Sequence, residues 1–132
     1  MKYASTDHRK YYAMWMKKSR NDDPCYKALF YTLAISPDVR THISQVFDFE
    51  NGMVKPEVLR QGWITSGSAK VIRLAFNLYT NGIPSSMYFT GEDEDDSEAM
   101  DEVRRYAPDE IFCCSYAPYF LEAICIRYPE YL

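Results

Sequence analysis

The chain has 132 residues, of which 47% are hydrophobic and 16% aromatic, and it carries a formal net charge of −4. This composition excludes a disordered chain, the length is that of one domain, and the acidic balance argues against a dedicated nucleic-acid-binding domain. No apolar run reaches the ~18 residues that cross a bilayer, and the first residues lack the apolar stretch of a signal peptide, so we expect a cytoplasmic protein.

Capping residues and apolar spacing predict three helices in the first part of the chain. The first covers about residues 6–19, with aromatic side chains on one face and lysines on the other. The second begins at Pro24 after a capping aspartate and runs to about Ile35 with almost no polar face, which favours a central, buried position. The third begins at Pro37, and its apolar stripe reaches Phe47.

The Asn51-Gly52 pair indicates a turn, and two further helices follow it. A short helix is expected at residues 56–61. A longer helix begins with Ser66 or Ser68 as its cap and ends at residues 81–82, where Asn-Gly is a good C-terminal stop. Because more than half of its circumference is apolar, this longer helix should join the second helix in the core.

The last third of the chain alternates between loop and helix. Residues 83–97 lack apolar periodicity and indicate a loop, and residues 97–105 predict a brief helix. Apolar periodicity returns from Pro108, but Pro118 lies inside the pattern, and an interior proline costs a helix about 3 kcal/mol. We therefore expect a kink there, or a break after which a new helix begins with Ser115 as its cap.

These elements predict a mainly α fold, a single compact helical domain over residues 1–132 with about five to six helices. One long loop occupies residues 83–97 and is acidic from residue 92. Within it, residues 87–89 are expected to be extended at most. The two most apolar helices should form the centre, with the C-terminal segment packed against them.

Acidic side chains concentrate in and just after the second half of the predicted loop. Residues 92–102 carry eight of the 19 acidic side chains and no basic one. One interpretation of this run is a solvated loop without a binding role. The functional alternative is a patch that imitates phosphate charge and occupies the basic groove of another protein. The candidate protein-binding residues are Glu92, Asp93, Glu94, Asp95, Asp96 and Glu98.

Basic side chains concentrate in the first 20 residues instead. They interleave with Tyr11, Tyr12 and Trp15, a pattern that can contact phosphates and stack on bases. A solvated helix face whose aromatic residues belong to the core explains the same pattern. The candidate nucleic-acid-binding residues are Lys10, Lys17, Lys18 and Arg20.

The stretch from Gly62 to Lys70 has the glycine spacing of a phosphate-binding loop, but Ser68-Ala69 stand where that motif needs lysine and a hydroxyl. A capped helix start explains the stretch without any ligand. The alternative is a loose anion site at the helix N-terminus that uses free N–H groups. Its candidate residues are Ser68, Lys70 and Arg73.

No residue pattern indicates catalysis, a metal or a cofactor. The cysteines are Cys25, Cys113, Cys114 and Cys125. They lack zinc or disulfide spacing and lie among apolar residues, where reduced thiols act as small hydrophobes. A nucleophilic thiol needs a nearby base, and the only histidines are His8 and His42. We therefore expect a non-enzymatic protein without cofactors, with a thiol or metal enzyme as the least favoured alternative.

Distinctive stretches lie at residues 26–35 (YKALFYTLAI), 40–43 (RTHI), 73–78 (RLAFNL), 109–120 (DEIFCCSYAPYF) and 127–131 (RYPEY). Together they resemble a family of small uncharacterised proteins carried on integrative and conjugative elements of low-GC Gram-positive bacteria. The resemblance leaves out the acidic loop and implies no catalytic residues. It implies a setting in which small cargo proteins often inhibit host defence, as anti-CRISPR proteins of similar length and acidity do.

The leading hypothesis is a non-enzymatic mobile-element protein that binds and inhibits or modulates a nucleic-acid-handling protein through its acidic surface. A CRISPR effector is one candidate partner. The alternative is a small nucleic-acid-associated regulator that uses the basic N-terminal helix. Neither hypothesis requires a membrane, and the sequence does not indicate an oligomeric state.

Overall fold

The computed structural model describes residues 1–89 and 97–132, which form eight α-helices, two 3-10 helices and a two-stranded antiparallel hairpin. The α-helices are α1 Thr6–Ser19, α2 Pro24–Leu33, α3 Pro37–Thr41, α4 Ile43–Val46, α5 Ser66–Thr80, α6 Ser97–Arg104, α7 Pro108–Ile111 and α8 Ala117–Arg127. The remaining elements are β1 Phe47–Asp48, β2 Met53–Val54, η1 Pro56–Arg60 and η2 Pro84–Phe89. The predicted mainly α, compact fold is confirmed.

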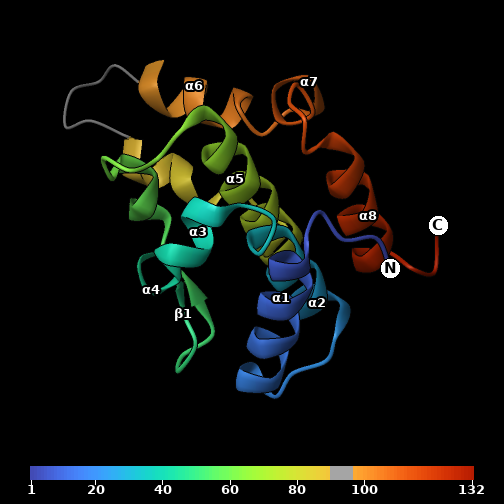
Figure 1. The fold of residues 1–132 in the computed structure, drawn as a ribbon. Helices are drawn as coiled ribbons and strands as arrows, with labels where there is room; N and C mark the ends of the chain where they lie inside the picture. Colours follow the sequence, from blue (N-terminus) through green and yellow to red (C-terminus); the bar gives the residue numbers. More distant parts are fainter. Residues whose placement is uncertain (90–96) are drawn as a thin grey trace.

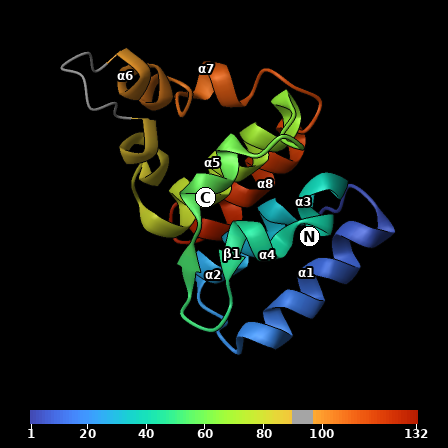
Figure 2. The ribbon, with the colours of Figure 1, turned by 90° about the vertical axis from the view of Figure 1, so that its left-hand side faces the viewer.

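Helices α2 and α5 pack against each other at the centre, and α1 and α8 pack on α2 (Figure 1). Every residue of α2 from Ala28 to Leu33 is fully buried, as its nearly continuous apolar sequence predicts. The inner residues of α5, among them Ile72 and Phe76, complete the same core. Helices α1 and α6 lie at opposite ends of the molecule in both ribbon views (Figure 2).

Helix α1 follows its prediction closely. The Ser5 side chain accepts a hydrogen bond from the His8 N–H at the start, and Arg20 ends the helix in the left-handed conformation with φ 60°. Trp15 is only 3% exposed, whereas the lysines of the opposite face are exposed. The aromatic side chains of α1 therefore belong to the core.

The predicted third helix is corrected to two short helices and a strand. The helix breaks between α3 and α4 at His42, whose backbone N–H and ring Nδ1 both bond to the Asp38 carbonyl. Such side-chain bonds to the preceding turn compete with helix continuation. Phe47 then enters the hairpin as β1 and pairs with Val54, while Gly52 forms the predicted turn with φ 67°.

Helix boundaries elsewhere need smaller corrections. Thr65 caps α5, where Ser66 or Ser68 was expected. The predicted loop at 83–97 contains η2, which includes residues 87–89 that were expected to be extended. Pro118 lies in the first turn of α8, so the break is confirmed, but Tyr116 precedes that helix and Ser115 does not cap it. These splits raise the number of described α-helices above the predicted five to six.

His8 makes the fold sensitive to acid. Its ring is fully buried, Nδ1 accepts a hydrogen bond from the Ala4 N–H at 2.9 Å, and Nε2 donates to the Tyr31 carbonyl at 2.7 Å. This neutral form is favoured because burial, together with the charge of Arg40, lowers the pKa of His8 from its ordinary value of 6.5. Protonation of Nδ1 would remove the bond to Ala4.

The free energy of unfolding should therefore fall between about pH 7.5 and about pH 5.5, by up to about 1.4 kcal/mol per pH unit. The sign follows because the unfolded chain takes up the His8 proton near pH 6.5, whereas the folded chain takes it up only at lower pH. Urea unfolding at several pH values measures the slope. His8→Gln should flatten it, and equal slopes for wild type and His8→Gln would contradict the assignment.

Candidate functional site

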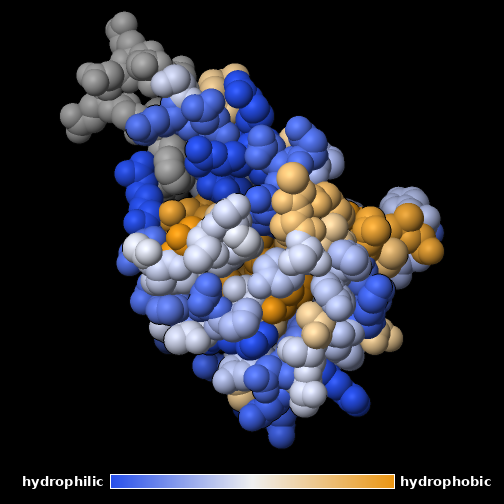
Figure 3. Space-filling model, turned by 45° about the horizontal axis from the view of Figure 1, so that its top comes forward, coloured by the Kyte–Doolittle hydropathy of each residue, from blue (hydrophilic) through white to orange (hydrophobic). Residues whose placement is uncertain are grey.

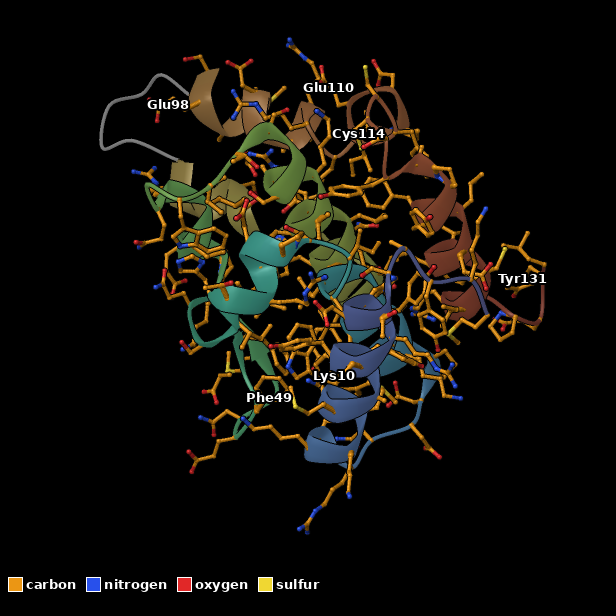
Figure 4. The ribbon with its side chains drawn as sticks, in the orientation of Figure 1. Lys10, Phe49, Glu98, Glu110, Cys114 and Tyr131 are labelled. Carbon is orange, nitrogen blue, oxygen red and sulfur yellow. The ribbon has the colours of Figure 1, made fainter. Side chains whose placement is uncertain are left out.

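The acidic run is divided between described and undescribed residues. Glu92, Asp93, Glu94, Asp95 and Asp96 lie outside the described residues. Glu98 is exposed in the first turn of α6 and is labelled in Figure 4. The surface around α6 is largely hydrophilic (Figure 3). Glu102, in the same run, is fully buried, which the sequence pattern did not indicate.

Glu102 is buried because a buried arginine pairs with it. Arg73 on α5 donates from Nε to Oε2 at 2.9 Å and from Nη2 to Oε1 at 2.8 Å. The Ser85 hydroxyl of η2 also donates to Oε2, and the Ser85 oxygen in turn accepts from the Tyr106 hydroxyl at 2.6 Å. Bidentate geometry and full satisfaction of the carboxylate are what make such a buried pair tolerable.

Tyr106 is held in the protonated form that this network needs. Burial raises the pKa of the Tyr106 hydroxyl to about 12, with a further contribution from the charge of Glu102. The hydroxyl therefore remains a hydrogen-bond donor to Ser85 at neutral pH. The network joins η2 and α6, the two elements on either side of residues 90–96, to α5.

The basic candidates Lys10, Lys17, Lys18 and Arg20 are all exposed at the α1 end of the molecule. Lys18 Nζ lies 4.4 Å from the ring centroid of Phe49, and Figure 4 labels Phe49 and Lys10 at this end. Trp15 is buried against Phe30, with ring centroids 6.2 Å apart, so its ring is not available to stack on a base. The basic face can contact phosphates without aromatic stacking.

The predicted anion site at the start of α5 needs correction. The Ser68 N–H donates to Thr65 Oγ1 at 3.1 Å, and the Thr65 N–H donates to Ser68 Oγ at 2.8 Å, which completes a capping box. Ser68 is thus engaged in capping the helix, and Arg73 is engaged with Glu102. Among the described residues, the hydrogen bond of Lys70 goes to a neutral group, the Ser66 hydroxyl, at 2.9 Å.

A cavity of about 340 Å³ opens beside this helix start. Leu59, Ile64 and Ala69 supply its apolar wall. Its charged lining consists of Lys70, Arg73, Arg105 and Glu110. Sequence reasoning found the first two but missed Arg105 and Glu110, because neither belongs to the local pattern around the α5 cap.

All four cysteines are free thiols, and they differ in exposure. Cys113 and Cys125 are exposed, a correction to the expectation that all four thiols lie among apolar residues, and all four are free. Both ring nitrogens of His8 are engaged in hydrogen bonds. Within residues 1–89 and 97–132, no three His, Cys, Asp or Glu side chains are grouped as metal ligands would be.

Replacing Glu102 should lower the free energy of unfolding and loosen the attachment of α6. Glu102 is the one buried residue of α6, and Glu102→Ala leaves the Arg73 charge buried without a partner, which costs about 3–5 kcal/mol. Urea unfolding should show this loss, and hydrogen exchange should show faster exchange of the α6 amides.

Glu98→Ala, an exposed change on the same helix, is the matched control and should alter stability by less than about 0.5 kcal/mol. A Glu102→Ala protein with wild-type stability and a protected α6 would refute the anchoring role of the Arg73–Glu102 pair.

Comparisons with known proteins identify a family for this chain but no relative of known activity. A search of curated proteins and a search of solved structures each found no match. In the described part of the chain, no helix combines the length and apolar character needed to cross a membrane. A family model matches residues 1–132, and the chain therefore belongs to the family of unknown function DUF6075.

Proposed function

We propose that the protein is a non-enzymatic mobile-element protein that binds and inhibits a nucleic-acid-handling protein, with a CRISPR effector as the candidate partner. The observation that carries this proposal is the run of seven acidic side chains at residues 92–101, next to the buried Glu102 that anchors α6 to Arg73. A dense set of carboxylates presents the charge that a basic nucleic-acid groove attracts. The partner class follows from that charge pattern.

The anchor matters because a charged surface must be held in place to compete with nucleic acid. The Arg73–Glu102 pair fixes α6, on which Glu98 and Asp101 are exposed, and Ser85 fixes η2 on the other side of residues 90–96. The elements before and after residues 90–96, η2 and α6, are therefore both linked to the core helix α5 through Glu102. Holding the exposed carboxylates of α6 in place in this way lowers the entropy cost of binding through them.

The acidic run should be necessary for inhibition. Purified, guide-loaded CRISPR effectors should form a complex with the wild-type protein and cleave target DNA more slowly in its presence. Changing Asp93, Glu94, Asp95 and Asp96 to Ser should weaken the complex at least about tenfold, and rising salt should weaken the wild-type complex because it screens the charges. Affinity and cleavage rate are the two measurements.

A matched control removes the same number of charges elsewhere. Asp22, Glu50, Glu57 and Glu130 are exposed and lie outside the run. Changing these four to Ser should leave binding and inhibition near the wild-type level. The proposal fails if no tested effector forms a complex, or if the two sets of substitutions weaken the complex equally.

A second candidate function, nucleic-acid-associated regulation, is favoured by the exposed lysines of α1. Lys10, Lys17 and Lys18 are solvated and have no carboxylate partner among the described residues. Because the α1 aromatic side chains pack inward, this function would rest on phosphate contacts and would be largely independent of base sequence.

A gel-shift titration with duplex DNA at several salt concentrations tests the second function. Each lysine that neutralises a phosphate contributes about 0.9 to the salt slope of binding, so changing Lys10, Lys17 and Lys18 to Gln should flatten that slope strongly. The control changes Lys2, Lys27 and Lys55 to Gln. Absence of a shift at low salt, or equal slopes for both variants, would exclude α1 as a nucleic-acid-binding surface.

A further inference from the structure

We propose that the cavity beside the start of α5 binds a small organic phosphate of the size and chemistry of a sugar phosphate. The cavity has a volume of about 340 Å³, within the usual range for small-molecule sites. It is therefore larger than an inorganic ion requires. Its lining combines cationic groups, one carboxylate and an apolar wall, and each of these restricts the class of ligand.

The charges around the cavity leave an excess of positive charge. Lys70, Arg73 and Arg105 are balanced only by Glu110 within the lining and by Glu102 behind Arg73. Glu102 already accepts two hydrogen bonds from Arg73 and one from Ser85. Three positive and two negative charges leave an excess of one positive charge, which favours an anionic phosphate ester over a neutral ligand.

Arg105 has a guanidinium that is available to such a ligand. Its Nη1 forms an ion pair with Glu102 Oε1 at 3.7 Å, longer than a hydrogen bond, and its side chain is 52% exposed, so its other donors can reach a ligand. Lys70 bonds to the Ser66 hydroxyl, a neutral group that does not cancel its charge. These two side chains come from different segments, α5 and the residue after α6, and converge on one cavity.

The remaining lining indicates an organic group attached to the phosphate. The carboxylate of Glu110 would repel a second anionic group but can accept hydrogen bonds from hydroxyl groups. Leu59, Ile64 and Ala69 can cover the carbon skeleton. A hydroxylated carbon chain that carries one phosphate fits the cationic groups, the Glu110 carboxylate and the apolar wall.

Binding of ribose 5-phosphate, followed by isothermal titration calorimetry and by the thermal unfolding midpoint, tests the proposal. The ligand should bind and raise the midpoint, because it stabilises only the folded state. Lys70→Gln and Arg105→Gln should each weaken binding about tenfold or more, since each removes a charge-assisted contact. Both side chains are at least partly exposed, so these variants should fold.

Arg104→Gln is the matched control, since Arg104 lies next to Arg105 in sequence, is exposed and is absent from the cavity lining. It should bind ribose 5-phosphate like the wild type. Ribose and succinate test the ligand class. The proposal is overturned if ribose 5-phosphate does not bind at millimolar concentration, if ribose or succinate binds as well, or if the Lys70 and Arg105 variants bind normally.

Discussion

The buried ion pair between Arg73 and Glu102 determines where one end of this molecule lies. Helix α6 has no buried apolar side chain, and Glu102 is its one buried residue. Helix α6 packs on η2, and no buried apolar side chain of α6 links it to the central core, whereas apolar burial holds α2 and α5 together. The Arg73–Glu102 pair attaches α6 to α5 instead. The bidentate hydrogen bonds and the bond from Ser85 offset the cost of removing these two charges from water.

The parts of the fold that sequence reasoning predicted well are those whose signals are local. The Asp23-Pro24 start and the apolar run after it identify α2 within a few residues. Periodicity and caps likewise locate α1 and α5. Where a local signal is ambiguous the prediction failed, as at His42, whose ring competes for a backbone carbonyl and divides one expected helix into two.

The site residues that sequence reasoning missed depend on contacts between distant segments. Glu102 belongs to a run that is typical of a solvated surface, and only its partner Arg73, 29 positions away, explains its burial. The same partner removes Arg73 from the simple anion site that the α5 start suggested. Arg105 and Glu110 join the cavity for a similar reason, since α7 packs on α5 and the Arg73–Glu102 pair ties α6 to α5.

The described charges are separated well enough for each surface to be altered alone. The lysines of α1 and the exposed carboxylates of α6 lie at opposite ends of the molecule, so screening limits their mutual influence. The cavity is closer to α6, yet Lys70 and Arg105 make none of the close hydrogen bonds to Glu102. Lys70→Gln leaves the ion pairs and hydrogen bonds of Glu102 in place, so ligand binding can fail while the anchor of the acidic run stays intact. Arg105→Gln also removes the longer ion pair to Glu102.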